Sequence, residues 1–191
     1  MIEFDAVVLA GGAGSRLGGV SKADVLVGGV PLLDRVLAGL SGAARVVVVG
    51  PPDVARPDVL RVQESPPGGG PVAGLAAGLA VGQSPFVVAL ACDAPRAPLA
   101  VPALLAALDG DGDGARLVAD GRPQHLVAVY RREALVGAFE RLGDPSGASM
   151  RALVHGLAVV DIPDVDDLAA DADTWPEVRR LDARLRGTIE P

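Results

Sequence analysis

A glycine-rich segment, residues 9–22, combines residue types that can bind a polyphosphate. It reads LAGGAGSRLGGVSK and contains five glycines together with Arg16 and Lys22. Glycine has no Cβ, so its backbone N–H can approach a ligand closely. Clustered N–H groups beside cations attract phosphate oxygens. We therefore predict that this segment binds phosphates through its backbone, Arg16 and Lys22, although cations on a surface loop are commonly just solvated.

Two common types of phosphate loop do not fit this segment. A Walker loop requires Gly-Lys-Ser/Thr, but Lys22 is preceded by Ser21 and followed by Ala23. A dinucleotide-binding fingerprint requires glycine where this chain has Leu17. It also requires an acidic residue after a second strand, and none follows the apolar run 46–49 directly. Both types of site are therefore excluded.

Asp93 is the second candidate for chemistry, because it follows the apolar run 86–92 directly. A carboxylate at the end of a central strand, opposite a phosphate loop, is well suited to hold Mg²⁺ on a triphosphate. The alternative is an aspartate that starts a turn before Pro95. Position alone leaves both interpretations open.

Asp171 and Asp173 form a third candidate group. In extended chain, alternate residues point to the same side, so these carboxylates could together face a metal or a second substrate. Alternatively they cap a helix that starts at Trp175, with Glu177 in its first turn. On the pattern alone, the capping interpretation is favoured.

Strand-like and helical segments alternate along the chain. Six apolar runs have the character of strands: 6–10, 45–49, 86–91, 116–119, 126–130 and 157–160. Six segments have helical character: 31–40, 72–81, 103–108, 132–142, 148–154 and 175–185. This alternation predicts an α/β fold with three layers and a doubly wound, mostly parallel, Rossmann-like sheet. The carboxyl ends of such strands meet at one edge, so we expect residues 9–22 and Asp93 to share one ligand.

Composition limits the type of protein. The length of 191 residues predicts one domain, 1–191. Half of the residues are apolar but only 3% are aromatic, which predicts helices of small residues packed closely on a valine-rich sheet. The net charge of −7 argues against a broad nucleic-acid surface. The single cysteine cannot form an intramolecular disulfide. The stretch 65–92 carries no charge, but its proline and glycine residues argue against a membrane-spanning helix. With no basic region near the N-terminus, we expect a cytoplasmic protein without a signal peptide or membrane span.

The arrangement LAGG-x3-R-x-G-x3-K resembles the signature of nucleotidyltransferases that activate a phosphate acceptor with an NTP. Within that group the chain is similar to the MobA-type molybdenum cofactor guanylyltransferases. Four further segments resemble this family in the same order: GPVAGL at 70–75, CDAP at 92–95, GRP to VYRR at 121–132, and DADT at 171–174.

The resemblance implies transfer of GMP from GTP to the terminal phosphate of molybdopterin, with Mg²⁺ as cofactor and release of pyrophosphate. It implies catalytic roles for Arg16, Lys22 and Asp93, and metal binding by Asp93 and Asp173. Arg122 and Asp171 are the implied acceptor contacts, with Arg131 and Arg132 as weaker candidates for that phosphate. The implied nucleotide-binding residues are Leu9, Ala10, Gly11, Gly12, Gly14, Lys22, Glu64, Gly70, Gly74 and Asp93.

Three other possibilities stay open at this stage. A related enzyme could use CTP, although relatives that transfer CMP tend to have LAAG where this chain has LAGG. Such an enzyme could also use another acceptor phosphate. Alternatively, the chain could bind a nucleotide without catalysing its transfer. Asp24 and His125 depart from the usual family pattern. The resemblance also implies transient contact with cofactor-biosynthesis or molybdoenzyme-maturation proteins.

Overall fold

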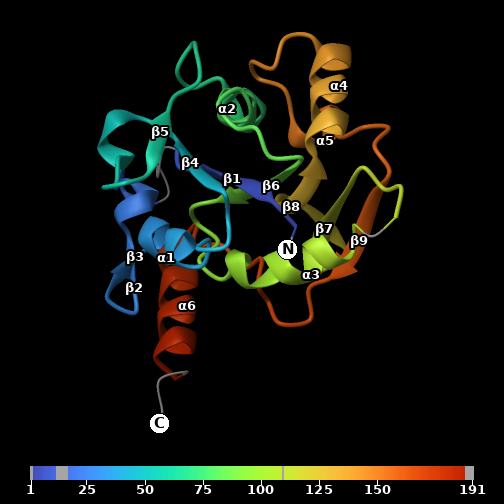
Figure 1. Ribbon diagram of the computed structural model, residues 1–191. Coiled ribbons are helices and arrows are strands. Elements are labelled where there is room, and N and C mark those ends of the chain that lie inside the picture. Colours follow the sequence, from blue (N-terminus) through green and yellow to red (C-terminus); the bar gives the residue numbers. More distant parts are fainter. Residues whose placement is uncertain (1, 12–16, 109, 188–191) are drawn as a thin grey trace.

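The computed structural model describes residues 2–11, 17–108 and 110–187, with side chains to residue 185. A seven-stranded sheet lies between two layers of helices, and a short hairpin lies beside the lower layer (Figure 1). The strands are β1 (Phe4–Leu9), β2 (Leu26–Val27), β3 (Val30–Pro31), β4 (Arg45–Val49), β5 (Leu60–Val62), β6 (Phe86–Ala91), β7 (Gly114–Ala119), β8 (Arg122–Arg131) and β9 (Val159–Pro163). The helices are α1 (Leu32–Ala38), α2 (Gly70–Leu79), α3 (Val101–Ala106), α4 (Arg132–Leu142), α5 (Met150–Leu153) and α6 (Trp175–Gly187).

The sheet has the strand order β5-β4-β1-β6-β8-β7-β9. Strands β5, β4, β1 and β6 are parallel, and β9 is parallel to β7, whereas β8 is antiparallel to both of its neighbours. The prediction of a mostly parallel sheet is confirmed. Strands β1, β4 and β6 therefore end at one edge, here called the carboxyl edge, and start at the opposite amino edge.

Small residues let the helices pack closely on the valine-rich sheet. Helices α2, α4 and α5 cover the upper face in Figure 1, and α1 and α3 cover the lower face. A Cβ on Gly78 of α2 would lie only 2.4 Å from Cγ1 of Val7, and one on Gly74 would lie 3.2 Å from Cδ2 of Leu9. Both glycines thus allow α2 to approach β1 more closely than a larger residue would permit.

Helix α6 packs on the segment that follows the glycine-rich residues. Val178 and Leu181 of α6 belong to one buried cluster with Leu17, Val25 and Leu32. Figure 1 shows α6 below the sheet, beside α1 and the β2–β3 hairpin. This apolar contact joins the end of the chain to its beginning, and it brings residues 171–173 toward the carboxyl edge.

A buried ion pair closes the amino edge. Asp5, only 2% exposed, accepts hydrogen bonds from the backbone N–H groups of Gln83 and Ser84 and from Nη2 of Arg132 at 2.7 Å. Arg132 also donates to the carbonyl oxygens of Ser84 and Leu79. The pair therefore joins β1, the end of α2, the start of β6 and the start of α4.

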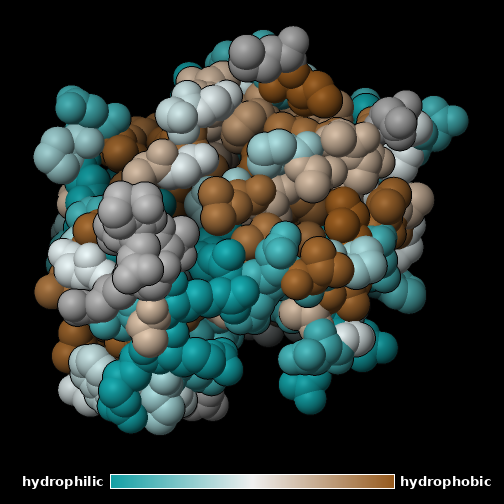
Figure 2. Space-filling model, turned by 90° about the horizontal axis from the view of Figure 1, so that it is seen from below, coloured by the Kyte–Doolittle hydropathy of each residue, from teal (hydrophilic) through white to brown (hydrophobic). Residues whose placement is uncertain are grey.

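The lower layer leaves part of its apolar surface uncovered. Figure 2 shows hydrophobic residues gathered on the side of α3 in the face seen from below. An apolar groove of about 380 Å³ lies there, lined in part by Ile2, Pro98, Val101 and Leu105. Since α3 has only six residues, it covers only part of this face. In the described residues, no helix has both the length and the apolar character needed to cross a membrane.

We expect Asp5→Ala to lower the free energy of unfolding by about 3–5 kcal/mol, because it leaves Arg132 and two backbone N–H groups without their partner. Urea unfolding followed by circular dichroism measures this loss. Asp111→Ala, which removes an exposed carboxylate, is the control and should change stability by less than about 0.5 kcal/mol. Equal effects of the two substitutions would contradict a stabilising role for the buried pair.

Candidate active site

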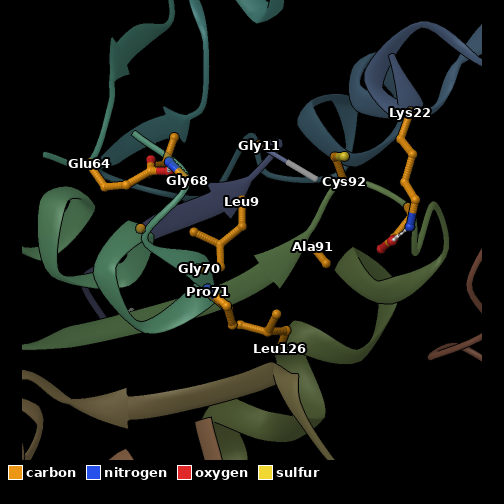
Figure 3. A pocket seen from close by; sticks show the side chains of 13 residues that line it. Leu9, Gly11, Lys22, Glu64, Gly68, Gly70, Pro71, Ala91, Cys92 and Leu126 are labelled. Carbon is orange, nitrogen blue, oxygen red and sulfur yellow. Dashed lines mark hydrogen bonds and ion pairs between the residues drawn. The ribbon is translucent and has the colours of Figure 1, made fainter. Parts of the chain in front are cut away.

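A cavity of about 410 Å³ opens at the carboxyl edge, where β1, β4 and β6 end and α2 begins (Figure 3). Its lining residues are Leu9, Gly11, Lys22, Val49, Glu64, Gly68, Gly70, Pro71, Gly74, Ala91, Cys92, Asp93 and Leu126. In Figure 3, Glu64 and Gly68 lie at one end of this cavity and Lys22 lies at the other. The cavity is therefore elongated, with different chemistry at its two ends.

Lys22 lies between two carboxylates at its end of the cavity. Its Nζ atom is 2.9 Å from Oδ2 of Asp93 and also donates a hydrogen bond to Oδ1 of Asp173. The Lys22 and Asp93 side chains are only 17% and 19% exposed. These three residues come from distant parts of the chain, since Asp93 is 71 residues and Asp173 is 151 residues from Lys22. The structure thus brings Leu9, Gly11 and Lys22, which are described residues of the glycine-rich segment, to the same cavity as Asp93.

Local backbone structure positions each member of this group. Lys22 begins a 3₁₀ turn, Lys22–Asp24, whose middle residue Ala23 is fully buried. Asp93 comes two residues after the last residue of β6. The backbone N–H of Ala172 donates to the carbonyl oxygen of Asp93 at 3.0 Å, which holds the 171–173 segment against the end of β6. Asp173 can then reach Lys22.

Helix α6 is capped by Thr174 and by Glu177, the first-turn glutamate of the predicted cap. The backbone N–H and the hydroxyl of Thr174 each donate to Oε2 of Glu177 at 2.8 Å. The N–H of Val178 donates to the carbonyl oxygen of Thr174 at 2.9 Å. Thr174 and Glu177 thus form the N-terminal cap. Oδ1 of Asp173 accepts a hydrogen bond from Lys22, so the capping interpretation does not account for the contact that this carboxylate makes in the cavity.

The charges at this end of the cavity perturb one another. Burial lowers the pKa of Lys22, but its hydrogen bonds to Asp173 and Asp93 outweigh this effect and raise that pKa above its ordinary value. Asp171 is exposed overall, but partial desolvation of its carboxyl group raises its pKa, and the negative charges of Asp173 and Asp93 raise it further. Lys22 is therefore protonated at neutral pH, and the surrounding carboxylates outnumber it.

The opposite end of the cavity is formed by a loop and the start of α2. Gly68 and Gly70 have φ values of 81° and 87°, a backbone conformation that residues with a side chain rarely adopt. Oε1 of Glu64 accepts a hydrogen bond from the N–H of Gly68 at 2.9 Å and closes this loop. The loop leads into Pro71 in the first turn of α2, whose N-terminus presents backbone N–H groups at the cavity.

The structure places most of the predicted nucleotide-binding residues at this cavity. Those that line it are Leu9, Gly11, Lys22, Glu64, Gly70, Gly74 and Asp93. Ala10 is buried beneath it and donates its N–H to the carbonyl oxygen of Val49 at 2.7 Å. Gly12, Gly14 and Arg16 lie outside the described residues, and their predicted roles stay predictions.

The three arginines considered for the acceptor phosphate lie elsewhere. Arg122 is exposed at the β7–β8 turn and is not one of the described residues that line the cavity, so its role stays a prediction. Arg131 donates to the carbonyl oxygens of Gly110 and Gly112, and Arg132 pairs with Asp5. Both lie at the amino edge, so assigning the acceptor phosphate to either of them is wrong.

Several apolar lining residues were not among the predicted site residues. Val49, Ala91 and Leu126 belong to the strands β4, β6 and β8 that border the cavity. Their position at strand ends is the signal that could have identified the first two. Cys92 is buried, and burial together with the charge of Asp93 raises its pKa to about 12. It is therefore a neutral thiol that packs as a small hydrophobic residue, as expected.

The donors fit a magnesium ion that arrives with a nucleotide. Among the described residues, no group of three acidic, histidine or cysteine side chains forms a preformed metal cluster. Asp93 and Asp173 instead supply two carboxylates held together by one ammonium group. Mg²⁺ in nucleotide enzymes is commonly bound by one or two carboxylates, with phosphate and water oxygens completing its shell. Two carboxylates at one end of an open cavity satisfy this requirement.

The sequence profile of the MobA-like NTP transferase domain matches residues 6–161, which include the glycine-rich segment and Asp93. The chain belongs to this family. It is 32% identical over 203 residues to a molybdenum cofactor guanylyltransferase of Albidiferax ferrireducens, covering 94% of this chain and 96% of the relative.

Solved structures share the fold. A molybdopterin-guanine dinucleotide biosynthesis protein A from Archaeoglobus fulgidus is 22% identical with a TM-score of 0.73, covering 96% of this chain and 99% of that one. A 2-C-methyl-D-erythritol 4-phosphate cytidylyltransferase from Thermus thermophilus is 21% identical with a TM-score of 0.70, covering 95% and 98%. The fold of the MobA-like family is therefore shared with an enzyme named for cytidylyl transfer.

We expect Asp171→Asn to raise the melting temperature at neutral pH, because it removes a carboxylate whose charged form is disfavoured in the folded protein. A folded-state pKa above the ordinary 3.8 costs stability only where the group is ionised. The difference from the unmodified protein should therefore shrink as pH falls toward 3.8. Thermal unfolding between pH 7 and 4 measures it, with Asp111→Asn as the control. A difference that grows toward low pH would contradict this account.

Proposed function

We propose that this protein transfers GMP from GTP to the terminal phosphate of molybdopterin and releases pyrophosphate, with Mg²⁺ as its cofactor. The observation that carries the proposal is the position of Lys22 between Asp93 and Asp173 on the wall of the cavity. Membership of the MobA-like family and the name of the Albidiferax relative support guanylyl transfer. Arg16, Arg122 and Asp171 complete the proposed set of substrate contacts.

This reaction requires few catalytic side chains. A phosphate monoester has a second pKa near 6, so the attacking phosphate is largely ionised at neutral pH without a general base. The barrier comes from repulsion between two anions and from charge that develops on the leaving pyrophosphate. Positioning and electrostatic stabilisation are therefore the main tasks of the protein.

The ion group at Lys22 suits an exchange of cations. Lys22 neutralises Asp93 and Asp173 in the free protein, and its flexible side chain can turn from them to the β- and γ-phosphates of a nucleotide. Asp93 and Asp173 are then available to hold Mg²⁺, which would draw negative charge away from the α-phosphate. The same residues thus keep the free site stable and bind the substrate.

The elongated cavity suggests the direction of the nucleotide. Lys22 at one end suits the triphosphate, and the Glu64 loop at the other suits the base, where a carboxylate and backbone groups can pair with the edge of guanine (Figure 3). The LAGG sequence favours GTP over CTP. Because a cytidylyltransferase shares this fold, the fold itself supports neither nucleotide over the other. We further propose a cytoplasmic location and transient contact with other proteins of cofactor synthesis or insertion.

Nucleotide preference is tested by thermal shift with GTP, CTP, UTP and ATP in the presence of Mg²⁺. We expect GTP to raise the melting temperature most, since at equal concentration the ligand with the lowest Kd stabilises the folded state most. Asp93→Ala should reduce that shift. An equal response to all four nucleotides would contradict the guanylyl assignment.

Turnover is tested by pyrophosphate release from GTP and molybdopterin. We expect Asp93→Ala to lower the rate about 10²–10³-fold, by analogy with the removal of one electrostatic contact to a transition state. Asp111→Ala should keep the normal rate. GTP binding without pyrophosphate release in the unmodified protein would favour a binding module without turnover.

A further inference from the structure

Arg56 forms an ion-pair network at the turn that begins with Lys22. Its Nη2 atom is 2.8 Å from Oδ1 of Asp24, and its Nε atom is 2.5 Å from Oδ1 of Asp34. The Arg56 side chain is only 17% exposed. None of these three residues belongs to the motifs that resemble the family. Asp24 itself is the departure from the family pattern noted two residues after Lys22.

The network is joined directly to the turn that carries Lys22. In this turn the N–H of Asp24 donates to the carbonyl oxygen of Ser21 at 3.1 Å, and that of Val25 donates to Lys22 at 3.2 Å. Asp24 ends the turn, and its side chain is held by Arg56. Arg56 also holds Asp34 in the first turn of α1. The guanidinium therefore links the Lys22 turn, α1 and the loop after β4.

Asp24 lies close to the cavity. It ends the three-residue turn that begins with Lys22, and Lys22 lines the cavity together with Asp93. A nucleoside triphosphate that enters here must already approach Asp93 and Asp173. An unpaired Asp24 would add a further repulsive charge on the same side.

We propose that Arg56 is a positioning residue for the nucleotide triphosphate, because it neutralises Asp24 in the turn that begins with Lys22. This inference rests on the proposed function, because it takes the cavity to be a GTP site. Burial lowers the pKa of Arg56, but its bonds to Asp34 and Asp24 raise it overall, so the guanidinium stays charged. Arg56 acts through the charge of Asp24 and need not touch the nucleotide.

The test is a titration calorimetry series with GTP and GMP, each with Mg²⁺. We expect Arg56→Met to weaken GTP binding about tenfold and GMP binding much less, because repulsion from Asp24 increases with phosphate charge. Asp24→Asn in the Arg56→Met background should restore most of the GTP affinity. Arg56→Lys, which keeps the charge, should bind GTP within about threefold of the unmodified protein. A merely structural role would weaken GTP and GMP equally and would not be rescued by Asp24→Asn.

Arg116→Met provides the matched control. Arg116 is also 17% exposed and pairs with one aspartate, Asp161, at 2.7 Å, but it lies on β7, away from the Lys22 turn. We expect this variant to bind GTP normally. A loss equal to that of Arg56→Met would overturn the inference.

Two outcomes separate this inference from the proposed function. Absence of GTP binding by the unmodified protein would contradict the proposed function. Normal GTP binding by both the unmodified protein and Arg56→Met would overturn the role of Arg56 alone. If Arg56→Met does not fold, GTP binding by the single variant Asp24→Asn tests the inference. This variant should bind GTP at least as tightly as the unmodified protein. Weaker binding by Asp24→Asn would overturn the inference.

Discussion

Two ionised carboxylates at one end of a cavity repel each other, and a cation between them relieves that repulsion. Here the ammonium group of Lys22 satisfies Asp93 and Asp173, and each of the three comes from a different part of the chain. The arrangement requires that β1 and β6 be neighbours, because their ends carry the glycine-rich segment and Asp93. It also requires that α6 pack on the β2–β3 hairpin, because that contact brings Asp173 to the carboxyl edge. The central sheet and the C-terminal helix thus meet one electrostatic requirement.

Much of this architecture follows from local sequence. The spacing of apolar residues predicts the observed bounds of β4, β6 and α4, because each of these elements is a continuous segment with clear ends. The apolar run 126–130 does not encode its direction, however, and β8 is antiparallel to both neighbours. Strand β5 and the β2–β3 hairpin are too short to produce a periodic signal. Thr174 and Glu177 have the spacing of a capping box, so the sequence alone could have assigned the cap to them and left Asp173 available for the cavity.

Long-range pairs of charges could not be predicted in this way. Arg132 lies in a segment that resembles a family motif, yet its partner Asp5 is 127 residues away and at the amino edge. Arg56 meets Asp34 and Asp24 across 22 and 32 residues. Spacing in the sequence identifies residues that share a helix face or a turn, but it carries no signal for such partners. Similarity to a motif therefore shows which residues matter in a family without showing which of them touch a substrate.

The separation of 151 residues between Lys22 and Asp173 also bears on synthesis of the protein. The ribosome makes β1 and the glycine-rich segment well before the segment that holds Asp173 and α6. A nascent chain can therefore form the central strands while Lys22 still lacks one of its two carboxylates. The complete ion group at Lys22 can form only after residues 171–173 have left the exit tunnel.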